Sequence, residues 1–359
     1  MPLSRIRLHS YLTLITLALL AVLLSPGIAA QQPPPPPGAY DAAPYLGEVR
    51  NRYLYGDIWE RPGLSPRDRS MITVAVNQAL YATNELRLHM GRALDNGVTQ
   101  AEISELIAHV LWYSGFPTGV NAARVAAEVF EERGLPETPP GASPRQPPAN
   151  PEAEFPGAFP QTPYLRDLLN QVVYAETWNR TELSPRDRSL ITVAVGTALY
   201  ASSEVRYHTG RALDNGVTPG EISEAITHVA FYAGLPTGVN ASRVAAEVFE
   251  SRGLPLPDAR FPGAPYLDDL IDGLVYGETW TRPALSPRDR SLVTIAMTQA
   301  AYQTDQLRAH LRRGLDNGIT PEELSELMAQ ITLYSGFPSG VNGSRVLAEV
   351  FQERGIPLP

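Results

Sequence analysis

The chain has 359 residues and a formal net charge of −9, with 29 basic residues against 38 acidic ones. No basic stripe is present to neutralise phosphates, which argues against a nucleic-acid partner. Cysteine is absent and every basic residue is an arginine. Thiol nucleophiles, thiolate metal sites and Schiff-base chemistry through a lysine amine are therefore excluded.

The first thirty residues have the features of a secretory signal peptide. Arg5 and Arg7 precede an apolar run over 11–24, and small residues follow. This order of a charged region, a short apolar region and a small-residue exit is typical of a cleaved signal. As a helix the run would span about 21 Å, short of the roughly 30 Å core of a bilayer. We therefore expect a periplasmic or secreted protein without stable membrane insertion, and an uncleaved anchor is the alternative.

The rest of the chain repeats one pattern three times. The string LSPRDRS occurs at 64–70, 183–189 and 285–291, each time followed by LDNG and then by a Gly-x-Pro segment. Each repeat is too long for a solenoid unit and has the size of a small domain. The predicted division is a signal peptide at 1–30, a proline-rich spacer at 31–43, repeat one at 44–136, a proline-rich linker at 137–162, repeat two at 163–255, a linker at 256–264 and repeat three at 265–357.

Each repeat is predicted to be helical throughout, so the fold class is all-α. Ser65 and Thr99 are followed three positions later by Asp and Glu, which is typical of capped helix starts. Gly97 is placed to end a helix, and the Gly115-x-Pro117 segment is expected to break one. No segment alternates with period two. For repeat one the pattern predicts a first helix over 44–59, a second from 66 to 81, a third around 85–94, a fourth from about 100 and a last helix over 120–133.

These motifs resemble the carboxymuconolactone decarboxylase family. The resemblance rests on W-x-R-x-x-L-S-x-R-D-R-S, E-L-R-x-H, A-L-D-N-G-x-T-x-x-E-I-x-E and Y-x-G-x-P-x-x-x-N, and it covers nearly all of each repeat. The family is related to the alkylhydroperoxidase D-like proteins. The resemblance implies an all-helical domain that forms trimers or hexameric rings with active sites near subunit contacts. Three fused copies are therefore expected in a pseudo-threefold arrangement, and two chains could pair into a six-domain particle.

Glutamate–histidine pairs are the candidate catalytic groups. Glu85 and His89, like Glu204 and His208, are four residues apart and share a helix face. A carboxylate beside an imidazole is expected to raise the imidazole pKa and to orient the ring. Repeat three has Gln306 before His310, and the resemblance places all three histidines at the family's active-site position. A second pair of the same spacing at 105/109 and 224/228 is also consistent with plain surface ion pairs.

Other recurring side chains are candidates for binding a substrate. Arginines in the first turn of the second helix could hold a carboxylate, or could merely cover the helix cap. A tyrosine and an asparagine flank the Gly-x-Pro break of each repeat, where they could face a pocket. The recurring tryptophans are expected to pack in the core or at a domain interface. The predicted substrate-binding residues are Arg67, Arg69, Arg186, Arg188, Arg288, Arg290, Tyr113, Tyr232, Tyr334, Asn121, Asn240 and Asn342.

The resemblance implies decarboxylation of a small carboxylate or lactone. An arginine would hold the carboxylate, a tyrosine or asparagine would stabilise the carbonyl oxygen, and a histidine would return a proton to carbon. The related peroxidases use a C-x-x-C motif that this chain lacks, so thiol peroxidase activity is excluded. We expect no metal and no cofactor. Two alternatives remain: another lyase or isomerase using the same groups, and a non-catalytic ligand-binding or scaffold protein.

Overall fold

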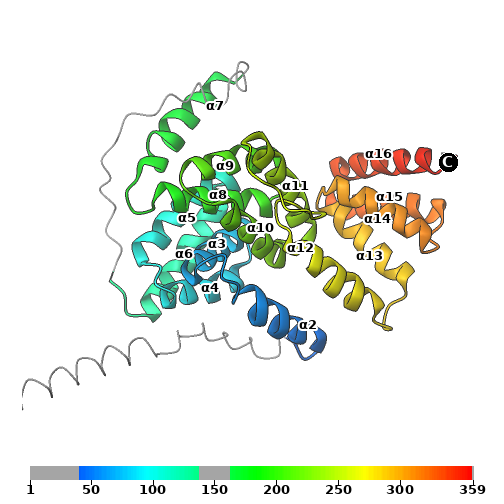
Figure 1. Ribbon diagram of the computed structural model, residues 1–359, viewed down its shortest axis with the longest axis horizontal. Helices are drawn as coiled ribbons and strands as arrows, with labels where there is room; N and C mark the ends of the chain where they lie inside the picture. The colour runs from blue at the N-terminus through cyan, green and yellow to red at the C-terminus, as the bar shows by residue number, and fades with distance from the viewer. Residues whose placement is uncertain (1–39, 137–161, 358–359) are drawn as a thin grey trace, which may run out of the picture. The chain divides into compact units, whose positions relative to one another are not determined.

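The computed structural model describes residues 40–136 and 162–357 (Figure 1). The predicted signal peptide, the spacer up to residue 39 and most of the first linker lie outside the described residues. Of the described residues, 40–61 form one compact unit, and those from Pro62 onward form another. The first unit contains α2 (Pro44–Val49) and the π-helical segment η1 (Arg50–Ile58), in which the rings of Tyr55 and Trp59 stack 6.1 Å apart.

The second unit holds four long helices from each repeat, and no strand occurs among the described residues. Repeat one contributes α3 (Pro66–Ala79), α4 (Thr83–Asp95), α5 (Gln100–Ser114) and α6 (Phe116–Glu132). Repeat two begins with α7 (Pro163–Leu168), η3 (Leu169–Tyr174) and η4 (Thr177–Asn179), followed by α8 (Pro185–Ala198), α9 (Ser202–Asp214), α10 (Pro219–Ala233) and α11 (Leu235–Ser251). Repeat three has α12 (Tyr266–Asp269), η5 (Leu270–Glu278), η6 (Thr279–Thr281), α13 (Pro287–Ala300), α14 (Thr304–Asp316), α15 (Pro321–Ser335) and α16 (Phe337–Glu353).

The helix starts follow the predicted capping chemistry. The side chain of Ser65 accepts a hydrogen bond from the backbone N–H of Asp68 at 3.0 Å. Pro66 is the first residue of the helix, where a backbone N–H would have no acceptor within the helix, and proline has no such N–H. Thr99 and Glu102 form a reciprocal capping box. The predicted break after α5 is sharper than expected, because α6 begins at Phe116 and carries its proline in the first turn. Only Gly115, with φ of 93°, lies outside a helix there.

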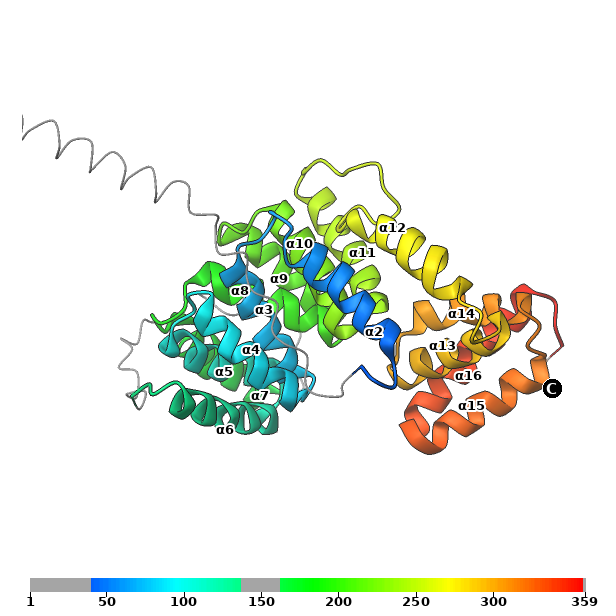
Figure 2. The ribbon, with the colours of Figure 1, turned by 90° about the horizontal axis from the view of Figure 1, so that it is seen from below.

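The all-α class and the three tandem helical domains are confirmed. The packing between repeats one and two is reciprocal and pairwise, and the pseudo-threefold arrangement of all three repeats stays a prediction. Helix α3 packs along α8, α3 also packs on α10, and α5 packs on α8, so each repeat offers the same helices to the other (Figures 1 and 2). This is the pattern of a pseudo-twofold pair, since equivalent surfaces meet each other.

Repeat three is joined to repeat two through its leading segment. Leu267 of α12 is fully buried and reaches Gly238 of α11, while Ser223 of α10 donates a hydrogen bond to the carbonyl of Gly263 at 2.7 Å. A Cβ atom at position 263 would lie 2.1 Å from the carbonyl oxygen of Ser242, so only glycine fits. The segment therefore fills the groove between α10 and α11.

Candidate functional site

An aromatic cluster built from both paired repeats surrounds His208. The Trp178 ring, from η4, stacks nearly parallel to the imidazole at 5.9 Å. Tyr113, at the end of α5 in the other repeat, meets the same imidazole edge-on at 5.3 Å. His109 of α5 lies 5.0 Å from Trp178, and the Trp178 Nε1–H donates to the Tyr113 hydroxyl at 2.9 Å. The two repeats thus share one site.

His208 is buried with its hydrogen-bonding capacity unused. Its side chain is 1% exposed, and neither ring nitrogen has a hydrogen-bond partner among the described residues. Glu204 is the nearest carboxylate, 3.8 Å from Nε2, which is beyond hydrogen-bond length. A buried polar group without a partner is rare in folded proteins and calls for an explanation. The nitrogens of His208 are therefore available to a bound molecule.

The electrostatics correct the expectation for this histidine. Burial and the nearby positive charge of Arg211 lower the pKa of His208 to about 3, so the ring is neutral at physiological pH. Glu204 does not raise it, because this carboxylate is 46% exposed and burial raises its own pKa. The Arg211 guanidinium lies 4.2 Å from the centre of the Trp178 ring and supplies the positive charge beside the imidazole.

His109 is held by a threonine of the other repeat. Its Nε2 lies 2.8 Å from the hydroxyl of Thr192, which also lies 2.7 Å from the carbonyl oxygen of Arg188. Nδ1 of His109 has no hydrogen-bond partner among the described residues. Burial and the charge of Arg188 hold the pKa of His109 well below its usual range. The plain surface ion-pair reading of this histidine is therefore wrong.

A buried ion-pair cluster joins the two repeats behind the site. The fully buried Arg188 of α8 donates to Glu105 of α5 at 3.1 Å, and Arg180 donates to the other oxygen of the same carboxylate at 2.6 Å. Burial lowers the pKa of Arg188. Since Glu105 is only 3% exposed, each charge depends on its partner from the other repeat.

The reciprocal site around His89 has the same plan. His89 is 2% exposed and meets the Tyr232 ring edge-on at 5.4 Å, and Tyr232 also contacts His228. The fully buried Arg69 pairs with Glu224 across the repeats at 3.2 Å. Nε2 of the α10 histidine meets the hydroxyl of Thr73 at 2.8 Å, as its counterpart does in the other site. Glu85 is exposed, whereas its counterpart in repeat two is half-buried.

The predicted substrate-binding arginines are engaged by carboxylates of the protein. Arg67 bonds Asp187 of the other repeat at 3.1 Å, and Arg186 bonds Asp68 at 3.1 Å in return. Each also contacts the capping glutamate of its own repeat. In repeat three, the arginine at 288 contacts its own capping glutamate, and the arginine at 290 donates to a backbone carbonyl. These arginines clamp the fold, and substrate binding by them stays a prediction.

The predicted asparagines do not reach the histidines. Asn121 donates to the hydroxyl of Thr83 at 3.2 Å at the start of α4, and Asn240 donates to Ser202 at the start of α9. They link two helices within a repeat. Asn342, their counterpart in repeat three, is half-buried. The structure favours tyrosine over asparagine as the polar group beside the imidazole.

Repeat three contains half of a site. His310 stacks on Trp280 at 6.1 Å, and burial together with Arg313 lowers the pKa of His310 to about 4. Nδ1 of His310 has no hydrogen-bond partner among the described residues. Tyr334, the counterpart of Tyr113, is 83% exposed and is not brought to His310.

Two functional positions were missed by sequence reasoning. The tryptophans were assigned to packing in the core or between domains, and Trp178 does pack between the repeats, but it also forms a wall of the site and donates to its tyrosine. Arg211 was not considered, although an arginine three residues after the histidine recurs in all three repeats. The available signal was the recurrence of this arginine at a fixed spacing. Its positive charge next to the histidine could have been used to predict the direction of the histidine pKa shift. Arg211 also lines, with Tyr207, a cleft of about 540 Å³ beside the cluster.

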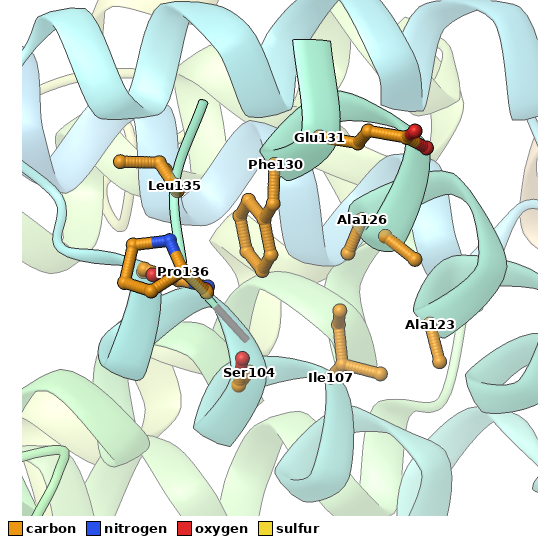
Figure 3. A pocket seen from close by; sticks show the side chains of 10 residues that line it. Ser104, Ile107, Ala123, Ala126, Phe130, Glu131, Leu135 and Pro136 are labelled. Carbon is orange, nitrogen blue, oxygen red and sulfur yellow. The ribbon is translucent and has the colours of Figure 1, made fainter. Parts of the chain in front are cut away.

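A groove of repeat one lies away from the site histidines. It has a volume of about 640 Å³ and is lined by Ser104 and Ile107 of α5, by Ala126 and Phe130 of α6, and by Pro136 (Figure 3). None of the site histidines lines it. The equivalent groove of repeat two is the one filled by the leading segment of repeat three. It is therefore a docking groove of the fold and not a reaction site.

The described residues provide neither a metal cluster nor a membrane span. No group of three or more His, Asp or Glu side chains within 40–136 and 162–357 could hold a metal ion. In the same ranges no helix is long and apolar enough to cross a bilayer.

Comparison with known proteins identifies related sequences. Residues 44–128, 163–247 and 265–349 each match the carboxymuconolactone decarboxylase family. A 4-carboxymuconolactone decarboxylase of Acinetobacter baylyi is 42% identical over 85 residues, which are 24% of this chain and 63% of that protein. A nitrosuccinic acid decarboxylase of Metarhizium robertsii is 34% identical over 85 residues, which are 24% of this chain and 59% of that protein. The chain thus matches less than two thirds of the length of either relative.

Proposed function

Because the chain belongs to the carboxymuconolactone decarboxylase family, we propose that it is a lyase that removes carbon dioxide from a small carboxylate. The reaction would take place in the two sites shared by repeats one and two. The observation that carries the proposal is His208, a buried imidazole with two unpartnered nitrogens between the rings of Trp178 and Tyr113. A site of this kind offers proton transfer to a ligand and costs stability when it is empty.

The substrate carboxylate would enter next to Arg211. The guanidinium is held over the Trp178 ring and also lines the cleft beside the aromatic cluster. A planar guanidinium matches the geometry of a carboxylate. Moving the carboxylate out of water into this aromatic site removes its hydration. Its loss as neutral carbon dioxide is then favoured, because the charge leaves the carboxylate and spreads over the rest of the molecule.

The electron pair of the breaking C–C bond would pass to a conjugated carbonyl oxygen of the substrate. Tyr113 is placed to stabilise that oxygen. Its hydroxyl oxygen accepts from Trp178 and also meets Thr192, and burial raises the pKa of the phenol, so the hydroxyl keeps its proton. Donation to the substrate would require that proton to turn toward the substrate oxygen. A hydrogen bond to a developing oxyanion in a water-poor site is worth more than the same bond in water.

His208 would return the proton to carbon. Its pKa of about 3 describes the empty site, where Arg211 is the dominant neighbouring charge. A bound carboxylate brings a negative charge, which raises the imidazole pKa and allows the ring to bind a proton. The proton is then delivered to the carbon from which carbon dioxide departed. His89 and Tyr232 would act in the same way in the reciprocal site.

Burial favours catalysis over a purely structural role for the domains. His89 and His208 are 2% and 1% exposed, and each meets a tyrosine of the other repeat. A scaffold needs no interior imidazole such as that of His208, whose two ring nitrogens lack hydrogen-bond partners among the described residues. An isomerase using the same proton transfer without C–C cleavage is separated from a decarboxylase by the release of carbon dioxide.

We further propose that the protein acts outside the cytoplasm, on the basis of residues 1–30. Export would separate it from intracellular aromatic catabolism, so its substrate would differ from that of the Acinetobacter relative. Fractionation of expressing cells, followed by mass spectrometry of the mature N-terminus, tests this location. An intact residue 1 in the cytoplasmic fraction contradicts it.

A carbon dioxide release assay tests the proposed activity. Carboxymuconolactone and nitrosuccinate are the first probes, because relatives act on them, followed by a panel of lactone and β-keto carboxylates. We expect release with at least one probe, and expect Tyr113→Phe combined with Tyr232→Phe to slow it about 10²-fold by removing the oxyanion donors. Turnover of a probe that is unchanged in the double variant contradicts the assigned role of the tyrosines.

A further inference from the structure

We propose that repeat three pairs with repeat three of a second copy of this chain, and that the partner's Tyr334 completes the site at His310. The face in question is formed by α13 and α15. In repeats one and two the corresponding faces cover each other. Because the chain has three repeats, pairing within one chain leaves the α13 and α15 face of repeat three uncovered.

The apolar part of this face is exposed only in repeat three. Val293 is 62% exposed and Met297 is 49% exposed. Their counterparts in repeat one, Ile72 and Val76, are fully buried against repeat two. The counterparts in repeat two, at 191 and 195, belong to the hydrophobic core of repeat one. Burying such side chains is favourable by about 25 cal/mol per Å², and an unpartnered patch of this kind marks an interaction surface.

The charged part of the face is self-complementary. Between repeats one and two, each arginine at the LSPRDRS motif meets an acid of the other repeat. Repeat three keeps both arginines of this pattern, the motif aspartate and the glutamate of α15, at 288, 290, 289 and 326. No carboxylate lies within ion-pair distance of Arg290 in the described part of the chain, and its Nε has no hydrogen-bond partner there. A twofold axis would place Glu326 of a second copy against Arg290, and the reverse.

Self-pairing also follows from the geometry of the existing interface. Repeats one and two present equivalent helices to each other, so their contact is isologous. A surface that pairs in this way needs no different partner, and a second copy supplies the same surface. Closed pairing of this kind ends at two chains through this face, and six repeats would be gathered in three pairs.

The third site is incomplete without the second copy. His310 has its tryptophan from its own repeat but no tyrosine, because Tyr334 points to the exposed face. In each completed site the tyrosine comes from the other repeat. Gln330 stands where the completed sites have a second histidine, and its amide could meet the hydroxyl of Thr294 across the axis. This inference concerns assembly and does not depend on the proposed decarboxylation.

Light scattering on the full mature chain tests the pairing. We expect the wild-type protein to have the mass of two chains, and Val293→Glu to have the mass of one chain. A charge placed at the centre of an apolar contact should weaken the pair by at least about 100-fold. Val293 is exposed within its own chain, so the substitution should leave the helical circular dichroism unchanged. Met297→Glu is a second variant with the same expected result.

Gln352→Glu is the matched control. It adds the same charge on α16, at an exposed position whose counterparts in repeats one and two remain exposed in their pair. We expect this variant to stay a pair of chains. Hydrogen exchange should show α13 and α15 losing protection in Val293→Glu, while α3 and α8 keep theirs. A wild-type chain that runs as a single copy, or a Val293→Glu chain that remains a pair, overturns the proposal.

Discussion

Repeats one and two carry the same motifs as repeat three, yet only the first two have complete sites. His208 and His310 both stack on a tryptophan of their own repeat. Tyr113 closes the site of His208 from the neighbouring repeat, whereas Tyr334 lies open to solvent. The difference lies in the partner and not in the motif. A site in this fold is therefore a property of two paired repeats, and a repeat alone holds half of it.

The histidines allow the sharpest test of this comparison. Replacing His89 and His208 together by glutamine should lower turnover by about 10²–10⁴-fold, because a positioned proton donor contributes that much. His310→Gln should leave most of the turnover, since the third site has Gln330 in place of the second histidine. Rates of carbon dioxide release from the purified double variant and from His310→Gln measure the two losses. A loss from His310→Gln as large as that from the double variant would place the working site in repeat three.

The buried ion pairs give the largest expected effect on stability. Glu105→Ala leaves the fully buried Arg188 without its carboxylate, and removing one partner of a buried pair costs about 3–5 kcal/mol. Glu326→Ala is the matched control, because the same glutamate of repeat three is exposed within its chain. Its cost should be within about 0.5 kcal/mol in the single-chain Val293→Glu background. Denaturant unfolding measures both, and equal losses would contradict the assigned role of the partner repeat.

The linker between repeats two and three offers a second comparison. Gly263→Ala drives a methyl group to 2.1 Å from the Ser242 carbonyl oxygen, so the segment must shift out of its groove. Overpacking of this kind costs about 1–3 kcal/mol. Gly273 lies in the helical segment η5 with open space around its Cβ position, and Gly273→Ala should stabilise the protein by about 0.4–1 kcal/mol. Opposite signs in thermal unfolding are the expected result, and two stabilising changes would contradict the docking of the segment.

The sequence was sufficient for the fold class, the repeats and the family. Capping signals at Ser65 and Thr99 are local, so they could be located without any knowledge of packing. The start of the last helix of repeat one was placed too late, at residue 120. Pro117 was taken as a helix breaker, although a proline is equally suited to the first turn of the next helix. The division into domains at the stated boundaries, the signal peptide and the location stay predictions.

Sequence reasoning located the histidines but not their surroundings. Partners of Arg69 and Arg188 come from residues more than eighty positions away, and no local pattern encodes such a contact. The expectation that Glu204 raises the pKa of His208 rested on spacing alone. The neighbouring repeat buries the imidazole, and this burial lowers the pKa of His208 where the sequence predicted that it would be raised. The pairing of repeats is therefore the fact that the sequence alone could not supply.

The acid sensitivity of the buried histidines tests the same comparison through the pH dependence of stability. In the unfolded chain a histidine has a pKa near 6.5, whereas folding lowers it to about 3 for His208 and to about 4 for His310. Between the folded and unfolded values the unfolded chain binds more protons, so stability is complete above about pH 6.5 and is lost as the pH falls. Each histidine should contribute a slope of about 1.4 kcal/mol per pH unit within its window.

Unfolding free energies of wild type and His208→Gln, measured between pH 7 and pH 4, should differ in slope by that amount. His310→Gln should also reduce the slope of the unfolding free energy between pH 7 and pH 4. It should leave the loss of stability between pH 4 and pH 3 unchanged, because only the window of His208 extends to that pH. Equal slopes for wild type and His208→Gln would mean that the ring is hydrated in the folded protein, and the closed site assigned to the paired repeats would then be wrong.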